Sequence, residues 1–230
     1  MATLKAPAGS SFGARIYRFY TTVSAPRLPA GVEAMNPYAN RVTRRYVKAY
    51  LDAFYADTRT RLLAFGINPG RFGAGITGVT FTDPVALAEY CGIENDLPRR
   101  RELSSVFIYD FIEEFGGLAE FAARCYIGAA APLGFTRRGL NLNYYDVPAL
   151  ARACRPFIIE SVEMHLAAGG RRDRAIVLGR GQNFAYLQRL NAEHRWFDEL
   201  VALDHPRFIL QYRRKRVPEY IERYVEAFGG

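Results

Sequence analysis

One segment of the chain combines residue types that can bind a flat, polar ring. It reads Gly66-Ile67-Asn68-Pro69-Gly70-Arg71-Phe72-Gly73 and runs on to Thr77-Gly78-Val79-Thr80-Phe81. The Asn68 amide both donates and accepts hydrogen bonds, and the Phe81 ring offers a flat face for stacking. The glycines let the backbone come close to a ligand. The segment therefore predicts a binding loop with a polar group and an aromatic platform.

Two later segments add groups that suit the same chemistry. Asp204-His205-Pro206-Arg207 supplies an imidazole, and Pro132-Leu133-Gly134-Phe135 is followed by a second amide at Asn141. A hydrogen-bond donor such as His205, aimed at an oxygen that gains negative charge, is typically worth ~2.7–4 kcal/mol. Each residue also has a structural interpretation, since Asn-Pro-Gly is a common turn and Phe81 suits a core. It is their occurrence together, in order, that favours a functional site.

The elements that must position these residues alternate between strands and helices. Strands are expected at 62–67, 124–131, 175–178 and 200–203, each bounded by glycine, proline or a helical pattern. Such alternation predicts a three-layer α/β/α sandwich with a central, mostly parallel four-stranded sheet. The candidate residues follow strands, so we expect them at the carboxyl edge of the sheet, where open α/β sheets bind ligands.

Other local signals complete the expected organisation. Residues 1–35 are expected to form an N-terminal extension that packs on a single catalytic domain, 36–230, through an aromatic patch at Ile16–Tyr20. Asp83 before Pro84 is a helix-capping signal. Residues 132–145 are expected to be a loop, and Pro156 favours a break in the helix expected at 148–168.

Composition limits the class of protein. Half of the 230 residues are hydrophobic and 23% are charged, which is typical of one folded domain. No apolar run approaches the ~20 residues of a membrane helix, and residues 1–13 lack a signal-peptide core. We therefore expect a cytoplasmic monomer, associated with the nucleoid if the source is a bacterium.

Cysteine and histidine spacing argues against a metal or cofactor. Cys91, Cys125 and Cys154 form no C-x-x-C pair, so neither structural zinc nor a four-cysteine iron–sulfur cluster is expected. The histidines at 165, 194 and 205 have no recognisable ligand spacing. A G-x-G-x-x-G match at 73–78 does not directly follow a strand, and Val79-Thr80-Phe81 follows where a helix should begin, so a dinucleotide fold is not favoured. The Gly-Lys-Ser/Thr ending of a nucleotide phosphate-binding loop is absent as well.

The charge points to a polyanionic partner. The net charge is +8 and the pI is near 9.5, with lysine only at positions 5, 48 and 215. Five positive residues fall within ten positions directly after His205, namely Arg207, Arg213, Arg214, Lys215 and Arg216. A charge run is usually a solvated face, but its place beside a candidate site favours contact with phosphates.

Taken together, the three segments resemble the motifs of the uracil-DNA glycosylase superfamily, in order, over roughly residues 60–220. The first segment is similar to that of the single-strand-selective monofunctional type, Gly-Met-Asn-Pro-Gly-x-Phe-Gly followed by Thr-Gly-Val-x-Phe, with Ile67 in place of methionine. The resemblance implies a uracil-DNA glycosylase that flips the base out of the DNA and hydrolyses its bond to the sugar. It implies neither a metal nor a cofactor.

The resemblance also implies roles for individual residues. Asn68 would hold the attacking water and His205 would stabilise the departing base anion. Phe81 would stack on the base and Asn141 would read its edge. The rest of the base pocket would be formed by Ile67, Gly70 and Phe72, and DNA would be contacted by Arg207, Phe208, Gln211, Tyr212, Arg213, Arg214 and Lys215. A lyase needs an amine, and Lys215 is the sole lysine near the motifs, so simple hydrolysis is expected.

The chain also departs from the family pattern. The usual Pro-Ser-Pro after the histidine is absent, so the segment that wedges into the duplex is expected to be rebuilt with Phe208, Gln211 or Tyr212. Alanines occupy 129–131, where the family has polar residues, and the first motif lacks an aspartate. Substrate range therefore stays open. Two other functions also remain open, a non-catalytic nucleic-acid-binding module and a hydrolase of free nucleosides or nucleotides.

Overall fold

Four parallel strands form the centre of the computed structural model, which describes residues 9–229. Their order is β3-β2-β6-β7, and each neighbouring pair is parallel. The bounds are β2 (Arg61–Gly66), β3 (Cys125–Ala129), β6 (Gly170–Leu178) and β7 (Glu199–Leu203). The expected four-stranded sheet is confirmed, with β6 beginning five residues before the predicted strand at 175. All six residues of β2 are buried, as expected for a central strand covered on both faces.

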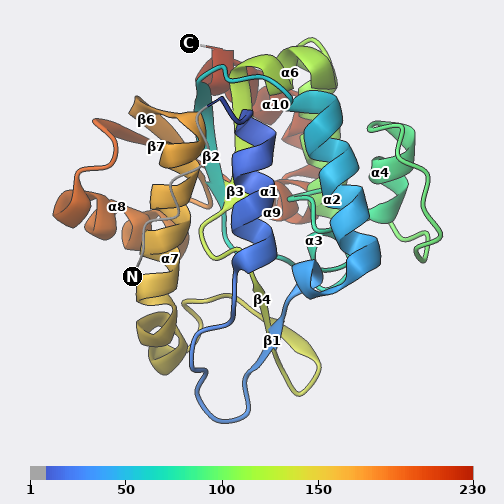
Figure 1. Ribbon diagram of the computed structural model, residues 1–230. Helices are drawn as coiled ribbons and strands as arrows, with labels where there is room; N and C mark the ends of the chain where they lie inside the picture. Colours follow the sequence, from blue (N-terminus) through green and yellow to red (C-terminus); the bar gives the residue numbers. More distant parts are fainter. Residues whose placement is uncertain (1–8, 230) are drawn as a thin grey trace.

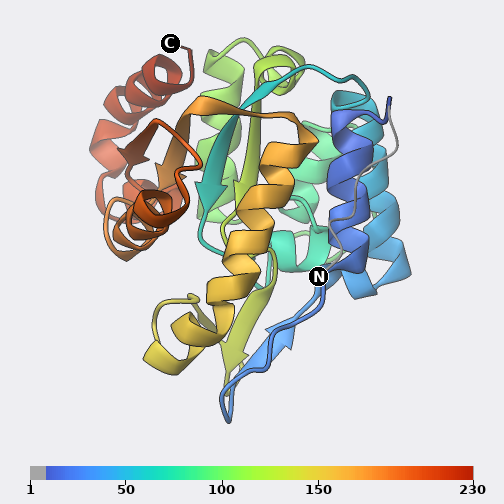
Figure 2. The same ribbon diagram turned by 60° about the vertical axis from the view of Figure 1, so that its left-hand side comes forward.

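Helices cover both faces of this sheet (Figures 1 and 2). On one face, Phe12 of α1 lies 5.2 Å from Tyr126 of β3, and His165 of α7 lies 5.6 Å from Phe65 of β2, measured between ring centroids. On the other face, Cys125 of β3 contacts the backbone of Phe228 in α10. The three-layer sandwich is thus confirmed. Its main helices are α1 (Phe12–Thr22), α2 (Arg41–Phe54), α5 (Leu103–Glu114), α6 (Leu118–Arg124), α7 (Pro148–Gly169), α8 (Gln182–His194) and α10 (Val217–Gly229).

Much of the expected N-terminal extension is a core helix. Ser11 caps α1 by accepting a hydrogen bond from the backbone N–H of Ala14, and Phe12 and Ile16 are fully buried. The aromatic patch therefore packs as expected, with Phe19 and Tyr20 also buried. Residues 1–8, which belong to the same predicted extension, lie outside the described part of the chain. The division at residue 35 remains a prediction.

A second, smaller sheet corrects the expectation of a loop at 132–145. Three antiparallel strands, β1 (Glu33–Met35), β4 (Gly134–Arg137) and β5 (Leu140–Leu142), pair in the order β1-β4-β5. Both views show β1 and β4 projecting beyond the end of the main sheet where its strands finish (Figures 1 and 2). The hairpin turn uses Arg138 and Gly139, both at positive φ. The strands are only three or four residues long, and neither β1 nor β5 contains a buried residue, so they carry too weak a hydrophobic alternation to be recognised.

The expected break at Pro156 is also wrong, because α7 runs without interruption from Pro148 to Gly169. Pro156 lies on the exposed side of the helix, as does Arg152, whose carbonyl the proline leaves without a partner. That carbonyl can bond to water. The opposite side, with Cys154, Phe157 and Ile158, is buried and holds the helix together through its packing.

Candidate active site

The three candidate segments meet in one cleft at the carboxyl edge of the parallel sheet, as expected. The cleft encloses about 790 Å³. Its walls are the loop after β2, the β5 strand, the residues before α5, and α9 (Pro206–Tyr212). Of the predicted site residues, it is lined by Ile67, Asn68, Gly70, Phe72, Phe81, Asn141, His205, Arg207, Phe208, Gln211 and Tyr212. Arg213, Arg214 and Lys215 do not line it and lie exposed just beyond α9.

Phe81 is held in an unusual backbone conformation at the floor of the cleft. Its φ is +54°, which residues with a side chain rarely adopt. Its ring lies over the end of β2, where a Cβ added at Gly66 would come within 2.9 Å of the ring. Gly66 is therefore required by the close approach of Phe81. The ring also lies 5.5 Å from the imidazole of His205, with an interplanar angle of 55°.

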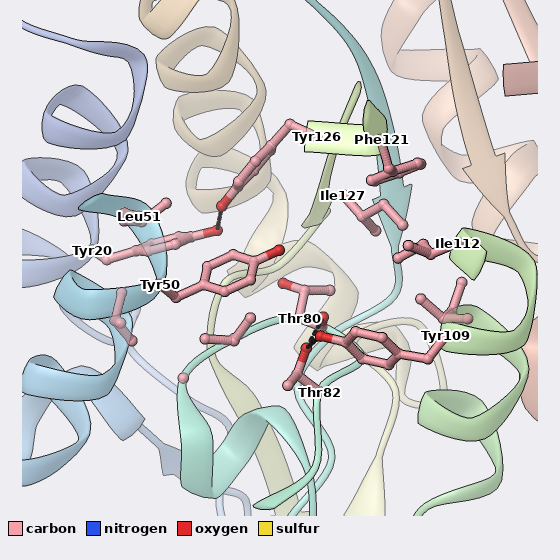
Figure 3. Close-up of a pocket in the computed structure, with 14 residues that line it drawn as sticks. Tyr20, Tyr50, Leu51, Thr80, Thr82, Tyr109, Ile112, Phe121, Tyr126 and Ile127 are labelled. Carbon is pink, nitrogen blue, oxygen red and sulfur yellow. Dashed lines mark hydrogen bonds between the residues drawn. The ribbon is translucent and has the colours of Figure 1, made fainter. Parts of the chain in front are cut away.

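Hydroxyl groups behind Phe81 keep this turn in place. The Thr77 hydroxyl donates to the carbonyl of Thr82 at 2.7 Å, and the backbone N–H of Thr82 donates to Val79. The Thr82 and Tyr109 hydroxyls are 2.9 Å apart. Thr82 and Tyr109 border a small cavity of about 20 Å³ that is also lined by Tyr20 and Tyr126, whose hydroxyls lie 3.0 Å apart (Figure 3). A cavity of this volume has room for about one water molecule.

The side chain of Asn68 is fixed by two hydrogen bonds to the segment after β5. Its Nδ2 donates to the carbonyl of Leu142 at 3.1 Å, and its Oδ1 accepts from the backbone N–H of Tyr144 at 3.0 Å. An amide offers two N–H donors and two acceptor lone pairs. One donor and one acceptor of Asn68 therefore remain for a ligand or water, in an orientation set by the protein.

His205 caps α9 and presents one defined N–H to the cleft. Its Nδ1 accepts a hydrogen bond from the backbone N–H of Arg207 at 3.2 Å, so in the neutral ring the proton is on Nε2. Burial, reinforced by the positive charge of Arg207, lowers the pKa of His205 to about 4. The ring is therefore neutral at physiological pH and acts as a donor through Nε2. His205 also has a structural role, since its ring caps the start of α9.

The segment after His205 forms a helix whose exposed side faces the cleft. On α9, Phe208 and Tyr212 are 37% and 60% exposed, with ring centroids 5.4 Å apart. The guanidinium of Arg213 lies over the Phe208 ring at 5.3 Å, and Gln211 donates to the Tyr212 hydroxyl. Large apolar side chains exposed beside a polar cleft are typical of a surface that contacts a partner.

Two other predicted base-binding residues, Asn141 and Phe72, line the cleft and have different neighbours. Asn141 lies exposed on β5, and its Nδ2 is 3.7 Å from the position of a Cβ added at Gly70. The backbone of Phe72 lies close enough to the carboxylate of Glu102 to act to lower the pKa of that group. The guanidinium of Arg100 lies 3.7 Å above the ring of Phe72, and that of Arg71 lies 4.6 Å from the same ring.

Four charged residues that line the cleft were not among the predicted site residues, namely Arg71, Arg100, Arg101 and Glu102. The run Arg99-Arg100-Arg101-Glu102 is a visible cluster of charge, but it lies outside every recognised motif. Only the folded chain brings it to the glycine-rich loop. Two arginines of this run form ion pairs, since Arg99 and Arg101 both contact Glu89 of α4 (Pro84–Glu89).

Asp83 caps a helix, as predicted. Its Oδ1 accepts hydrogen bonds from the backbone N–H groups of Val85 and Ala86 at 2.9 Å each. Its Oδ2 accepts from the backbone N–H of Glu102 at 2.8 Å. Asp83 is buried and does not line the cleft. Its carboxylate therefore fixes the backbone at Glu102.

Among residues 9–229, there is no cluster of three or more His, Cys, Asp or Glu side chains able to hold a metal ion. None of the helices found there has the length and apolar character needed to span a membrane.

The fold and cleft described above define a member of a known superfamily. The family model of the uracil DNA glycosylase superfamily matches residues 53–229, and the chain belongs to that superfamily. Among solved structures, the chain is similar to the crystal structure of wild-type SMUG2 from Pedobacter heparinus. The two are 40% identical, the match covers 95% of this chain and 97% of that chain, and the TM-score is 0.92. No curated protein matches the chain.

Proposed function

We propose that this protein is a DNA glycosylase that hydrolyses the N-glycosidic bond of uracil in DNA. The observation that carries the proposal is the convergence of Asn68 and Phe81, from the loop after β2, with His205, from the distant loop after β7, in one cleft. Membership of the superfamily and the likeness to SMUG2 support the same activity. The cleft is far larger than one base and has arginines on its rim, which favours a polymer over a free nucleoside.

The base reaches the cleft by leaving the DNA stack. Extrusion costs a few kcal/mol, which stacking on Phe81 helps to offset, since base–aromatic stacking is worth about 1–3 kcal/mol per base. The exposed side chains of α9, Phe208 and Tyr212, fill the space that the base leaves. Asn141 contacts the edge of the base with its amide.

Bond cleavage then needs a water molecule on one side and a charge acceptor on the other. The free acceptor and donor of Asn68 hold a water whose oxygen attacks C1′ of the sugar, and the proton that this water loses passes to solvent, from which the released uracil anion later takes one up. The bond between C1′ and N1 of uracil breaks, and its electron pair passes into the ring and onto O2. The Nε2–H of His205 donates to that oxygen. A neutral donor there stabilises the anion without first needing a proton from solvent.

Simple hydrolysis, without a lyase step, is part of the proposal. A lyase requires an amine that attacks C1′. Lys215 is exposed in the short 3-10 helix Arg214–Arg216 and does not line the cleft. The product is then an intact strand that carries an abasic site. We also propose a monomeric, cytoplasmic protein that binds DNA along α9 through Arg207, Arg213, Arg214 and Lys215.

End-labelled oligonucleotides with one uracil test this proposal. They are offered as single strands and opposite guanine or adenine, and products are separated before and after alkali. We expect strand breaks only after alkali, and no covalent adduct on addition of borohydride. Breaks without alkali together with a borohydride adduct would indicate a lyase.

The same assay separates the alternatives. Binding of the oligonucleotide with no excision in any context would indicate a non-catalytic module. Release of uracil from free deoxyuridine, but not from oligonucleotides, would indicate a nucleoside hydrolase. Either result would overturn the proposed activity.

A further inference from the structure

Glu102 places a carboxylate inside the cleft, where the steps above give it no role. It is the residue before α5, but its side chain makes no hydrogen bond to that helix. Its backbone N–H is held by Asp83 at 2.8 Å. The backbone is thus fixed from behind and the side chain is directed into the cleft that it lines.

The carboxylate of Glu102 lies directly against the glycine-rich loop. A Cβ added at Gly73 would clash with its Oε2 and lie 3.0 Å from its Cδ. A Cβ added at Gly70 would lie 3.6 Å from its Oε1 and 3.7 Å from the Nδ2 of Asn141. Glu102 and Asn141 therefore flank Gly70, with a carboxylate and an amide close to one point of the cleft.

This carboxylate is short of hydrogen-bond donors. The backbone of Phe72 acts on it as a nearby donor group, while an ionised carboxylate has about four acceptor sites. None of the ion pairs found among residues 9–229 includes it. Burial, and next the negative charge of Asp83, raise the pKa of Glu102, whereas Arg207 and Arg100 act to lower it. A partly buried acceptor of this kind is stabilised by a donor on a ligand.

We propose that Glu102 is a specificity-determining residue that accepts a hydrogen bond from the ring N–H of the extruded base, N3–H in uracil. This inference rests on the proposed function. Asn141 cannot distinguish uracil from cytosine by itself, because rotation of its amide presents either a donor or an acceptor to the base. A carboxylate accepts only. Cytosine has a lone pair at N3 in place of the N–H, so that edge is repelled by Glu102.

The test compares two substrates that differ at N3. Single-turnover excision is measured on matched oligonucleotides that carry uracil or N3-methyluracil, with wild-type protein, Glu102→Ala and Glu102→Gln. The Glu113→Gln variant is the control, because Glu113 is an exposed residue of the same type on the same helix. Thermal unfolding of each variant checks that it is folded.

We expect Glu102→Ala to excise uracil roughly 10- to 100-fold more slowly, as for loss of a hydrogen bond to a charged group. Its slow excision of N3-methyluracil should differ from that of wild type by less than about twofold. The ratio of the uracil rate to the N3-methyluracil rate should therefore become smaller. In Glu102→Gln the new amide can donate to N3 of cytosine, and we expect cytosine excision above the wild-type level. Glu113→Gln should behave as wild type.

Three results would contradict the inference. Equal loss on both substrates in both Glu102 variants, with no gain on cytosine, would mean that Glu102 only supports the glycine-rich loop. Unchanged uracil excision in both variants would mean that it does not contact the base. If wild-type protein excises no uracil at all, the proposed function itself falls, and this inference with it. Should Glu102→Ala fail to fold, the near-isosteric Glu102→Gln decides through its activity on cytosine.

Discussion

The rings of Phe81 and His205 lie 5.5 Å apart at an angle of 55°, close enough for one base to contact both. A base stacked on Phe81 would bring its edge to the Nε2–H of His205. The platform comes from the loop after β2 and the donor from the loop after β7, so the sheet sets their separation. In the proposed function, this pair would link recognition of the base to stabilisation of its charge.

The platform itself can be tested by changing Phe81. We expect Phe81→Leu to lower kcat/KM by roughly 5- to 100-fold, because a stacked base is worth about 1–3 kcal/mol. Phe81→Tyr keeps the flat face and should stay within a few-fold of wild type. Single-turnover rates on a uracil oligonucleotide measure both variants. Equal loss in the two would indicate that Phe81 serves packing and not stacking.

Gly66 offers a test of position without removal of the ring. A Cβ in Gly66→Ala would meet the Phe81 ring at 2.9 Å and displace it. We expect excision to fall by about tenfold or more, the cost of a misplaced group, with only a small change in the thermal midpoint. Gly229→Ala is the control, because Gly229 is helical and a Cβ there meets nothing within 4 Å. Full activity in Gly66→Ala would show that the ring position is not critical.

Stability should depend on pH through His165. This histidine is fully buried, its Nδ1 is bonded to the carbonyl of Ser161, and its Nε2 has no hydrogen-bond partner. Burial lowers its pKa to about 4, below the value of 6.5 in the unfolded chain. Between these values the unfolded chain binds the proton and the folded chain does not. The free energy of unfolding therefore falls as pH drops from about 6.5 to 4.

The decrease in the free energy of unfolding that His165 alone causes is on the order of 3 kcal/mol, since each pKa unit is worth about 1.4 kcal/mol. Urea unfolding of wild type and His165→Leu over this pH range measures it. We expect a smaller pH slope in the variant. The pKa of His205 is lowered to a similar value, so some slope should remain. An unchanged slope in His165→Leu would contradict the assignment.

Binding of DNA should weaken with salt in a way that reports the arginines of α9. Each phosphate contact removed should reduce the slope of log affinity against log salt by about 1. We expect this for Arg207→Ala and for Arg213→Ala, measured with a uracil-free oligonucleotide. Arg124→Ala is the control, because Arg124 also lies over an aromatic ring, Phe115, but at the opposite edge of the sheet. Equal slopes of log affinity against log salt in wild type and all three variants would indicate that DNA does not contact Arg207 or Arg213.

The sequence was sufficient to predict features whose cause is local. The buried run of β2 and the cap at Asp83 follow from neighbouring residues, and both are confirmed. That Asn68, Phe81 and His205 share one cleft followed from their places after parallel strands. The roles of these residues remain predictions.

Features set by distant parts of the chain were not predictable in the same way. The β4–β5 hairpin gains its order from pairing with β1, about a hundred residues earlier, and its strands are short. Continuity of α7 through Pro156 depends on which side of the helix is buried. Glu102 becomes a cleft residue only because Asp83 and the glycine-rich loop fold against it.

The central claim is that Asn68 and His205 carry out excision of uracil in this cleft. The most direct measurement is the single-turnover rate on a uracil oligonucleotide for wild type, Asn68→Ala and His205→Ala. His194→Ala is the control, because His194 is an exposed histidine on α8, away from the cleft. We predict losses of about 100-fold or more in the first two variants, as when a charge-stabilising group is removed, and none in the control. Wild-type rates in both Asn68→Ala and His205→Ala would contradict the account.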